Sequence, residues 1–260
     1  MSANFRTLVA YFLFSITLIT IGASFGALAL ASRVRSGSWG LPSRSDLVWL
    51  GDLLHDSDDE PSRVVYLNPA KITIIGDDDD SHANRSSIVP AGQRAVLPGY
   101  TGSDRAWKQI VHCVQDRFVD FDVAITEHRP VDRGYTMVAV GGRPSDLGIQ
   151  RERVSGLSPF NGAPIADSVV FAFSETHSNR VRDTCETIAH ELGHTYGLDH
   201  SYECEDLMTH LTGCRAKRFV DASVPCGEQS QRPCHDDRPT QSSYGTLMAI
   251  LGPRHDAGLP

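Results

Sequence analysis

The stretch 183–200, DTCETIAHELGHTYGLDH, constrains the fold more than any other part of the chain. It begins like a helix, because Asp183 can cap free backbone N–H groups and Glu186 stands where a capping-box acid is expected. Its periodic part ends at Gly197, where a helix needs a residue that adopts a left-handed conformation. We therefore predict one helix over residues 183–196, followed by a sharp reversal of the chain.

Three histidines in this stretch are spaced to hold one metal ion. His190 and His194 stand four residues apart, so they share one face of the predicted helix. The reversal at Gly197 lets His200 return to the same face. Three imidazoles with an open fourth position are typical of a catalytic zinc site. Glu191 is placed to hold a metal-bound water without being a ligand itself.

The segment HELGHTYGLDH, residues 190–200, matches the extended zinc signature HExxHxxGxxH at every fixed position and resembles the metzincin clan of zinc peptidases. The resemblance implies Zn²⁺ as the cofactor, the three histidines as ligands, and Glu191 as general base and then general acid. It also implies a methionine beneath the site, for which Met208 is the candidate. Gly197 and Met208 would thus support the centre. The spacing to Met208, and Ser201 directly after the third histidine, resemble the matrixin branch.

The chain departs from the clan in three respects. His210 stands two residues after Met208, where astacin-like and serralysin-like members have a tyrosine, which argues against those branches. Residues 32–63 contain no cysteine, so we expect no latency through a pro-segment thiol. The chain after Met208, which would shape the substrate pocket, resembles no segment that we can name. His210 itself receives no assigned role.

The resemblance, together with the three-histidine site, implies a secreted, zinc-dependent endopeptidase that hydrolyses peptide bonds with a zinc-activated water. Two alternatives keep the same site. One is a zinc-stabilised extracellular binding or adhesion domain with little or no turnover, and the other is a zinc amidase with a non-peptide substrate. Glu191 favours an enzyme, because a binding domain would not need it. We expect a protein or peptide as the partner and a monomeric chain.

The amino terminus predicts export from the cytoplasm. Leu8 to Ala31 carries no charge, and Ala29-Leu30-Ala31 has the A-x-A form of a signal-peptidase site. Residues 1–31 are therefore expected to be a signal peptide, or else an uncleaved membrane anchor. Residues 32–62 are expected to be a linker or short pro-segment, and residues 63–260 a metzincin-like catalytic domain.

The cysteines form an even set of six, which in an exported protein predicts disulfides. Six cysteines allow 15 connectivities. The simplest of them joins the near neighbours Cys204–Cys214 and Cys226–Cys234 and leaves Cys113–Cys185. No C-x-x-C spacing supports a cysteine zinc site.

The charge balance excludes one class of partner. The 260 residues include 24 Lys+Arg and 32 Asp+Glu, a net charge of −8, with no long basic run. A nucleic-acid binder would need such runs to neutralise phosphates. With 40% hydrophobic residues the chain has enough apolar side chains for a folded core.

The remaining pattern predicts an α+β fold of metzincin-like type, with a twisted mixed sheet, two main helices and a small irregular, disulfide-rich C-terminal subdomain. Apolar residues at spacings of three and four predict the other helix over residues 103–118, with Ser103 as N-cap. Strands are predicted at residues 63–67, 72–75, 121–125, 136–140 and 168–173.

Two expectations follow from the element order. The metzincin resemblance implies that substrate lies along an edge strand, and residues 168–173 are expected to be that strand because they directly precede the metal-site helix. After Gly213 the chain is rich in Pro, Gln, Ser and Cys, and we expect little regular structure there.

Two weaker signals remain. Asp77–Asp80 offers hard oxygen ligands, so the alternatives are a Ca²⁺ site and a solvated acidic turn, and no EF-hand spacing supports the first. The other histidines are interpreted as surface or core residues: His55, His82, His112, His128, His177, His235 and His255.

Overall fold

The computed structural model describes residues 63–150, 154–235 and 237–254. All of them lie in the second of two units of the chain, residues 57–260. The expected signal peptide or anchor, residues 1–31, and the expected linker or pro-segment, residues 32–62, lie outside the described residues.

The centre of the fold is a five-stranded mixed sheet in the order β5-β1-β6-β8-β7. The pairs β1–β5, β1–β6 and β6–β8 are parallel, and β7 runs antiparallel to β8. The strands are β1 (Val64–Asn68), β5 (Ala124–Thr126), β6 (Thr136–Val140), β7 (Gly156–Leu157) and β8 (Val169–Ala172). Strands β6 and β8 are buried along their whole length, which explains why they consist of unbroken, largely apolar runs rather than alternating patterns.

A smaller three-stranded sheet has the order β3-β2-β4, with β2 antiparallel to β4. Its strands are β2 (Ile72–Gly76), β3 (Arg85–Ser86) and β4 (Arg94–Leu97). Ile74 and Leu97 of this sheet share an apolar cluster with Met137 and Phe171 of the main sheet. The small sheet therefore covers one face of the main sheet.

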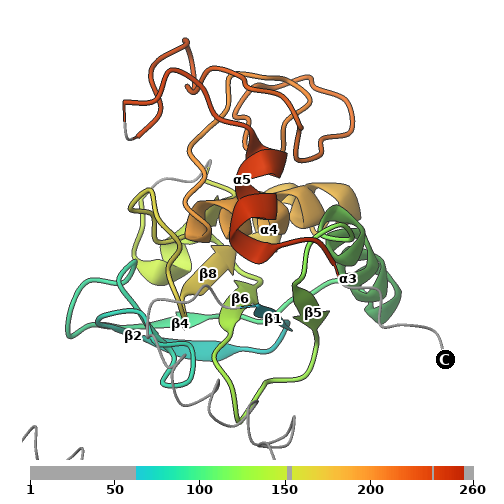
Figure 1. The fold of residues 1–260 in the computed structure, drawn as a ribbon. Helices are drawn as coiled ribbons and strands as arrows, with labels where there is room; N and C mark the ends of the chain where they lie inside the picture. The colour runs from blue at the N-terminus through green and yellow to red at the C-terminus, as the bar shows by residue number, and fades with distance from the viewer. Residues whose placement is uncertain (1–62, 151–153, 236, 255–260) are drawn as a thin grey trace, which may run out of the picture. The chain divides into compact units, whose positions relative to one another are not determined.

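Helices cover the opposite face, as Figure 1 shows. The two long helices are α3 (Asp104–Arg117) and α4 (Val181–Thr195), and two short 3-10 turns are η1 (Pro144–Leu147) and η2 (Ser174–His177). The core on this side combines sheet residues with both helices, including Leu67, Val138, Ile110, Val114 and Ile188.

The predicted helix starts are confirmed for one helix and wrong for the other. The Ser103 hydroxyl accepts a hydrogen bond from the N–H of Ala106 at 3.2 Å and caps α3 as predicted. Helix α4 begins at Val181 with Arg180 as N-cap, so Asp183 lies inside the first turn instead of capping it. There its negative charge still favours the helix through the dipole.

The expectation of little regular structure after Gly213 is wrong at one place. Helix α5 (Ser243–Leu251) begins with Ser242, whose hydroxyl accepts from the N–H of Gly245 at 3.0 Å. Leu247 and Leu251 of this helix are fully buried in the core that also contains α3 and α4. The mixed α+β class is confirmed, but the described residues contain three α-helices instead of two.

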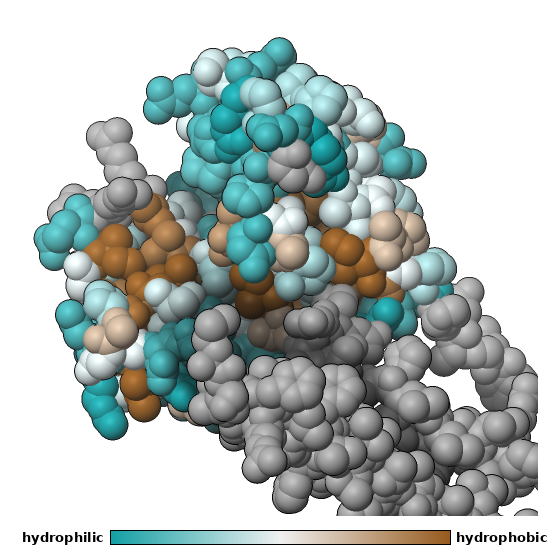
Figure 2. Space-filling view, turned by 60° about the vertical axis from the view of Figure 1, so that its left-hand side comes forward, coloured by the Kyte–Doolittle hydropathy of each residue, from teal (hydrophilic) through white to brown (hydrophobic). Residues whose placement is uncertain are grey.

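The rest of the segment between residues 201 and 241 is irregular, as expected. It forms the orange-to-red loops at the top of Figure 1. Figure 2 shows that the upper part of the molecule is mostly hydrophilic, while apolar side chains gather below it.

The edge of the main sheet is not where the sequence placed it. Strand β8 lies between β6 and β7, and the edge strand on this side is β7. Residues 156–157 give no visible strand pattern because the strand has only 2 residues. The expectation that residues 168–173 form the edge strand is therefore wrong.

All six cysteines are paired in the connectivity that the sequence made simplest: Cys113–Cys185, Cys204–Cys214 and Cys226–Cys234. The first bridge joins α3 to α4 and the other two lie in the irregular C-terminal segment. Three disulfides are consistent with an extracellular protein. Within the described part of the chain no helix is both long and apolar enough to cross a bilayer.

Replacing Cys113 and Cys185 together by serine is expected to lower the free energy of unfolding by about 4 kcal/mol, because the bridge closes 72 residues of the unfolded chain. The same change at Cys204 and Cys214, which are 10 residues apart, should cost about 3 kcal/mol or less. Guanidinium unfolding followed by circular dichroism measures both. Equal or reversed losses would contradict the chain-entropy explanation.

Candidate metal centre

The structure brings the three signature histidines to one point. Helix α4 carries His190 and His194 on its buried side, and the chain reverses at Gly197, whose φ of +83° is the left-handed value expected for a helix-ending glycine. The Nε2 atom of His194 lies 3.1 Å from that of His190 and 3.0 Å from that of His200. Nitrogens bound to one tetrahedral zinc at 2.0–2.1 Å lie about 3.3 Å apart, close to these spacings.

Backbone carbonyl oxygens determine the proton positions on two of the rings. The Nδ1 atom of His190 lies 2.8 Å from the carbonyl oxygen of Leu207, and that of His194 lies 2.7 Å from the carbonyl oxygen of Leu198. A carbonyl only accepts, so each Nδ1 carries the proton and donates it. In the neutral ring Nε2 then presents a lone pair, as a metal ligand must.

Both rings are neutral near pH 7. Burial lowers the pKa of His194 to about 3, and burial together with the neighbouring imidazoles holds the pKa of His190 well below its usual value. Because each ring donates its only N–H proton from Nδ1 to a carbonyl oxygen, neither Nε2 carries a proton. No hydrogen bond can therefore form across the 3.1 Å between the Nε2 atoms of His190 and His194. A cation between the Nε2 atoms satisfies both lone pairs, so the donor set fits a metal ion.

The third histidine has a different partner. His200 Nδ1 lies 2.7 Å from Oε1 of Glu228, a residue that sequence reasoning did not single out. Arg232 contacts the same oxygen at 2.6 Å and also pairs with Asp199 at 2.6 Å and 2.8 Å. The hydrogen bond from Arg232 lowers the pKa of Glu228 to about 2, so this carboxylate is ionised at neutral pH.

Glu191 lies next to the histidines and is only 7% exposed. The hydroxyl of Ser158 donates to its Oε2 at 2.8 Å. Burial raises the pKa of Glu191 to about 8. A cation bound by the neighbouring histidines would lower that pKa by favouring the carboxylate.

Strand β7 passes directly over Glu191. A Cβ atom at Gly156 would lie 2.6 Å from Cγ and 2.7 Å from Oε1 of Glu191, and 2.8 Å from the methyl group of Thr187. Such separations are too short for carbon atoms, so only glycine allows this approach. This role of Gly156 could not be predicted from the sequence, because an isolated glycine in a short strand has no pattern.

Met208 is fully buried beneath the helix. A Cβ at Gly193 would lie 2.4 Å from its sulfur, so the methionine packs against the backbone of α4. Its carbonyl oxygen accepts from the N–H of Ser201 at 3.0 Å, which ties it to the third-histidine segment. These contacts suit the supporting role expected for Met208.

His210 joins the cluster, although the sequence left its role open. Its ring centroid lies 4.1 Å from that of His200 and 5.4 Å from that of His190. Potential ligand atoms of these three residues all lie within 4.8 Å of one another. The sequence feature that could have placed His210 in the cluster is its position two residues after Met208.

Of the histidines set aside, five lie in the described part of the chain, and none of them belongs to a group of three potential ligands there: His82, His112, His128, His177 and His235. His235 approaches the centre indirectly, since Phe160 contacts both its ring and that of His194. His55 and His255 lie outside the described residues.

The acidic run Asp77–Asp80 has protein partners. Arg85 pairs with Asp77 at 3.1 Å and with Asp80 at 3.0 Å. Asp79 accepts hydrogen bonds from Ser86 and Ser87. These contacts favour an acidic turn over a Ca²⁺ site.

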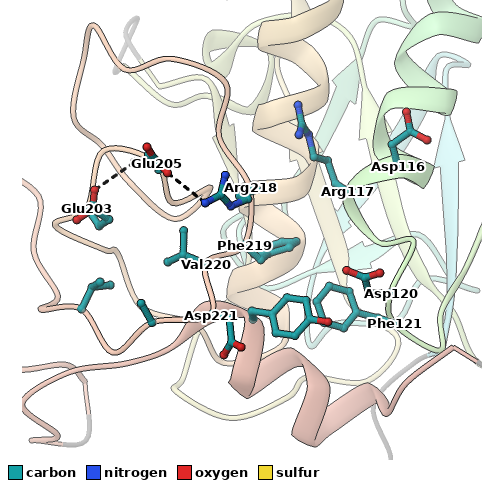
Figure 3. Close-up of a pocket in the computed structure, with 13 residues that line it drawn as sticks. Asp116, Arg117, Asp120, Phe121, Glu203, Glu205, Arg218, Phe219, Val220 and Asp221 are labelled. Atoms are coloured by element: carbon teal, nitrogen blue, oxygen red, sulfur yellow. Dashed lines mark hydrogen bonds and ion pairs between the residues drawn. The ribbon is translucent and has the colours of Figure 1, made fainter.

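A separate cavity of about 590 Å³ lies between the end of α3, the loop 203–224 and α5. Figure 3 shows Arg218 reaching toward Glu205, with which it pairs at 3.2 Å. Five acidic and two basic residues line it: Asp116, Asp120, Glu203, Glu205, Asp221, Arg117 and Arg218. It includes none of the residues predicted from the signature.

Neither a scan against protein-family models nor a search of curated proteins finds a match for this chain. The structure establishes a mixed α+β fold in which buried histidine and acidic groups can hold a metal ion.

Asp206, two residues before Met208, is fully buried and accepts a hydrogen bond from the N–H of Met208 at 3.1 Å. Burial raises its pKa to about 6, so the native state binds more protons than the unfolded chain between about pH 4 and 6 and loses stability as pH rises through that range. Asp206→Asn should therefore be more stable than wild type at pH 7.5 by about 2–3 kcal/mol. Near pH 4 the difference should nearly vanish.

Urea unfolding of both metal-free proteins at several pH values measures this difference. A difference that does not change with pH would show that Asp206 is not the titrating group.

Proposed function

We propose that this chain is a zinc-dependent endopeptidase of the metzincin type, similar to the matrixin branch. The observation that carries the proposal is the convergence of the His190, His194 and His200 Nε2 atoms beside a buried carboxylate that is not one of them, Glu191. A site that only stores a metal needs the nitrogens. A hydrolase also needs a base next to them.

Zinc is the metal that suits this donor set, because it prefers nitrogen ligands in a tetrahedral arrangement and needs no redox partner. When bound, it would supply a Lewis acid that activates water and polarises the scissile carbonyl group. His190, His194 and His200 would hold it through Nε2.

The chain's own residues carry the proton transfers. Glu191 accepts the proton of the attacking water on a carboxylate oxygen and then passes it to the nitrogen of the leaving amine. Ser158 restrains the other side of this carboxylate through the 2.8 Å hydrogen bond to Oε2. The low exposure of Glu191 keeps bulk water from competing for that proton.

Strand β7 supplies a place for an extended substrate. It is the last strand of the main sheet on its side, and its outer edge has no strand partner among the described residues. An extended peptide can add to such an edge through backbone hydrogen bonds, largely independent of its sequence. Because Gly156 lies over Glu191, a peptide bound there would pass close to the base. We propose that the enzyme acts outside the cytoplasm, where its three disulfides are stable.

One observation favours the binding or adhesion alternative. His210 offers a further nitrogen near the three ligands, and four protein ligands are typical of closed, structural zinc sites. An active enzyme requires that His210 leave one position to water. Peptidase activity therefore decides between the enzyme and the binding domain. A zinc amidase would use the same residues on a non-peptide substrate.

Glu191→Ala should keep the metal and lose peptidase activity, by about 100-fold or more, because the variant has the ligands but no base. Incubation of the full chain with a proteome-derived peptide library, with and without a chelator, measures cleavage and subsite preference together. Metal content is measured on the same samples. Cleavage by Glu191→Ala at the wild-type rate would contradict the assigned role, and no cleavage by fully metal-loaded wild type would favour the binding domain.

Gly156→Ala should lower kcat by about 10-fold or more with little change in metal content, because the new Cβ displaces the Glu191 side chain. Gly213→Ala is a control for the steric contact: a Cβ there meets no atom within 4 Å, and its φ of +77° adds a backbone strain that Gly156 does not have. Peptide cleavage and metal content are compared for both variants. Equal activity in both would show that the approach of β7 to Glu191 has no functional role.

A further inference from the structure

The three histidines differ in what holds them. Backbone carbonyl oxygens hold His190 and His194, whereas His200 depends on a side chain from the irregular C-terminal segment, Glu228. A charged carboxylate is a stronger acceptor than a neutral carbonyl. The third ligand therefore has a partner that mutation can remove without changing the backbone.

The loop that carries Glu228 is attached to the His200 segment. The disulfide Cys226–Cys234 closes this loop, and the N–H of Gly227 donates to the carbonyl oxygen of His200 at 2.9 Å. Gly227 has a φ of +140°, and a Cβ there would lie 1.9 Å from the carbonyl oxygen of Ser230, so the turn requires glycine. The backbone thus places residue 228 beside the third histidine.

Arg232 restrains the carboxylate from the other side. Its guanidinium contacts Glu228 and, through two nitrogens, Asp199, which is 5% exposed. Asp199 in turn accepts from the N–H of His200 at 2.7 Å. His200 is therefore enclosed by a network whose members restrain one another, with a net charge of −1 from two carboxylates and one guanidinium.

We propose that Glu228 is the positioning residue of the metal centre: it keeps the proton of His200 on Nδ1 and the ring oriented toward His190 and His194, and Arg232 holds it in place. Partners of this kind raise the basicity of a ligand nitrogen and typically contribute 10–100-fold to metal affinity. The inference rests on the proposed function only in taking the three histidines as the ligand set.

A direct role for Glu228 as a metal ligand is the competing explanation. Asp199, His200 and Glu228 also offer atoms within 4.8 Å of one another. Arg232 occupies both carboxylates, however, and its positive charge opposes a cation at that position. The Nδ1 of His200 faces Glu228, while its Nε2 faces His194, so Glu228 acts through the ring.

The test measures Zn²⁺ affinity of the full chain by competition with a chromophoric chelator, and the visible spectrum of the Co²⁺-substituted protein. Glu228→Ala should bind Zn²⁺ 10–100-fold more weakly than wild type and shift the Co²⁺ bands, because His200 loses its orientation. Glu228→Gln keeps the side-chain shape and one acceptor oxygen, so its Zn²⁺ affinity should lie between those of wild type and Glu228→Ala. Glu186→Gln is the matched control, because Glu186 also pairs with an arginine four residues away, at 2.8 Å, without contacting a signature histidine.

Zn²⁺ affinity of Glu228→Ala and Glu228→Gln within twofold of wild type would overturn the proposal. So would an equal loss in Glu186→Gln, since it would then reflect general destabilisation. If Glu228→Ala fails to fold without metal, Glu228→Gln decides, with circular dichroism as the check on folding. Neither readout needs peptidase activity, so a wild type that binds Zn²⁺ but cleaves no peptide would refute the proposed function and leave this inference standing.

Discussion

The close approach of the Nε2 atoms of His190, His194 and His200 is the constraint on which the centre depends. The neutral rings of His190 and His194 direct their Nε2 lone pairs toward each other across 3.1 Å, which is unfavourable unless a cation binds both. The carbonyl oxygens of Leu207 and Leu198 accept hydrogen bonds from Nδ1 of His190 and His194, which leaves Nε2 of both rings available to a metal ion. The local structure is thus suited to the metal-bound state.

The centre combines two parts of the chain with different kinds of support. Helix α4 is held by the main sheet and by the Cys113–Cys185 bridge to α3, and it carries two of the histidines. His200 and Met208 belong to the irregular segment that follows. A metal ion bound by all three histidines would link these parts, so we expect ion binding and the order of the C-terminal loops to be coupled.

The sequence predicted what depends on local pattern and missed what depends on distant contacts. Helix α4, the glycine that ends it and the simplest disulfide connectivity were visible in spacing alone. Strand β7 and the role of Gly156 were not, because a 2-residue strand has no periodicity. Glu228 was missed because its importance comes from a hydrogen bond to a residue 28 positions earlier, made possible by a disulfide-closed loop. Helix α5 was missed because the segment around it is rich in Pro, Gln, Ser and Cys, although the helix itself ends in the apolar run 247–251.

The shortness of β7 has a consequence for the behaviour of the protein in solution. An exposed sheet edge is a template on which other chains can pair, and long edges of this kind lead to aggregation. An edge of 2 residues offers few backbone groups for such pairing, and the strand cannot be extended into a stable intermolecular sheet without further contacts. A free edge this short therefore offers little for pairing between copies of the chain.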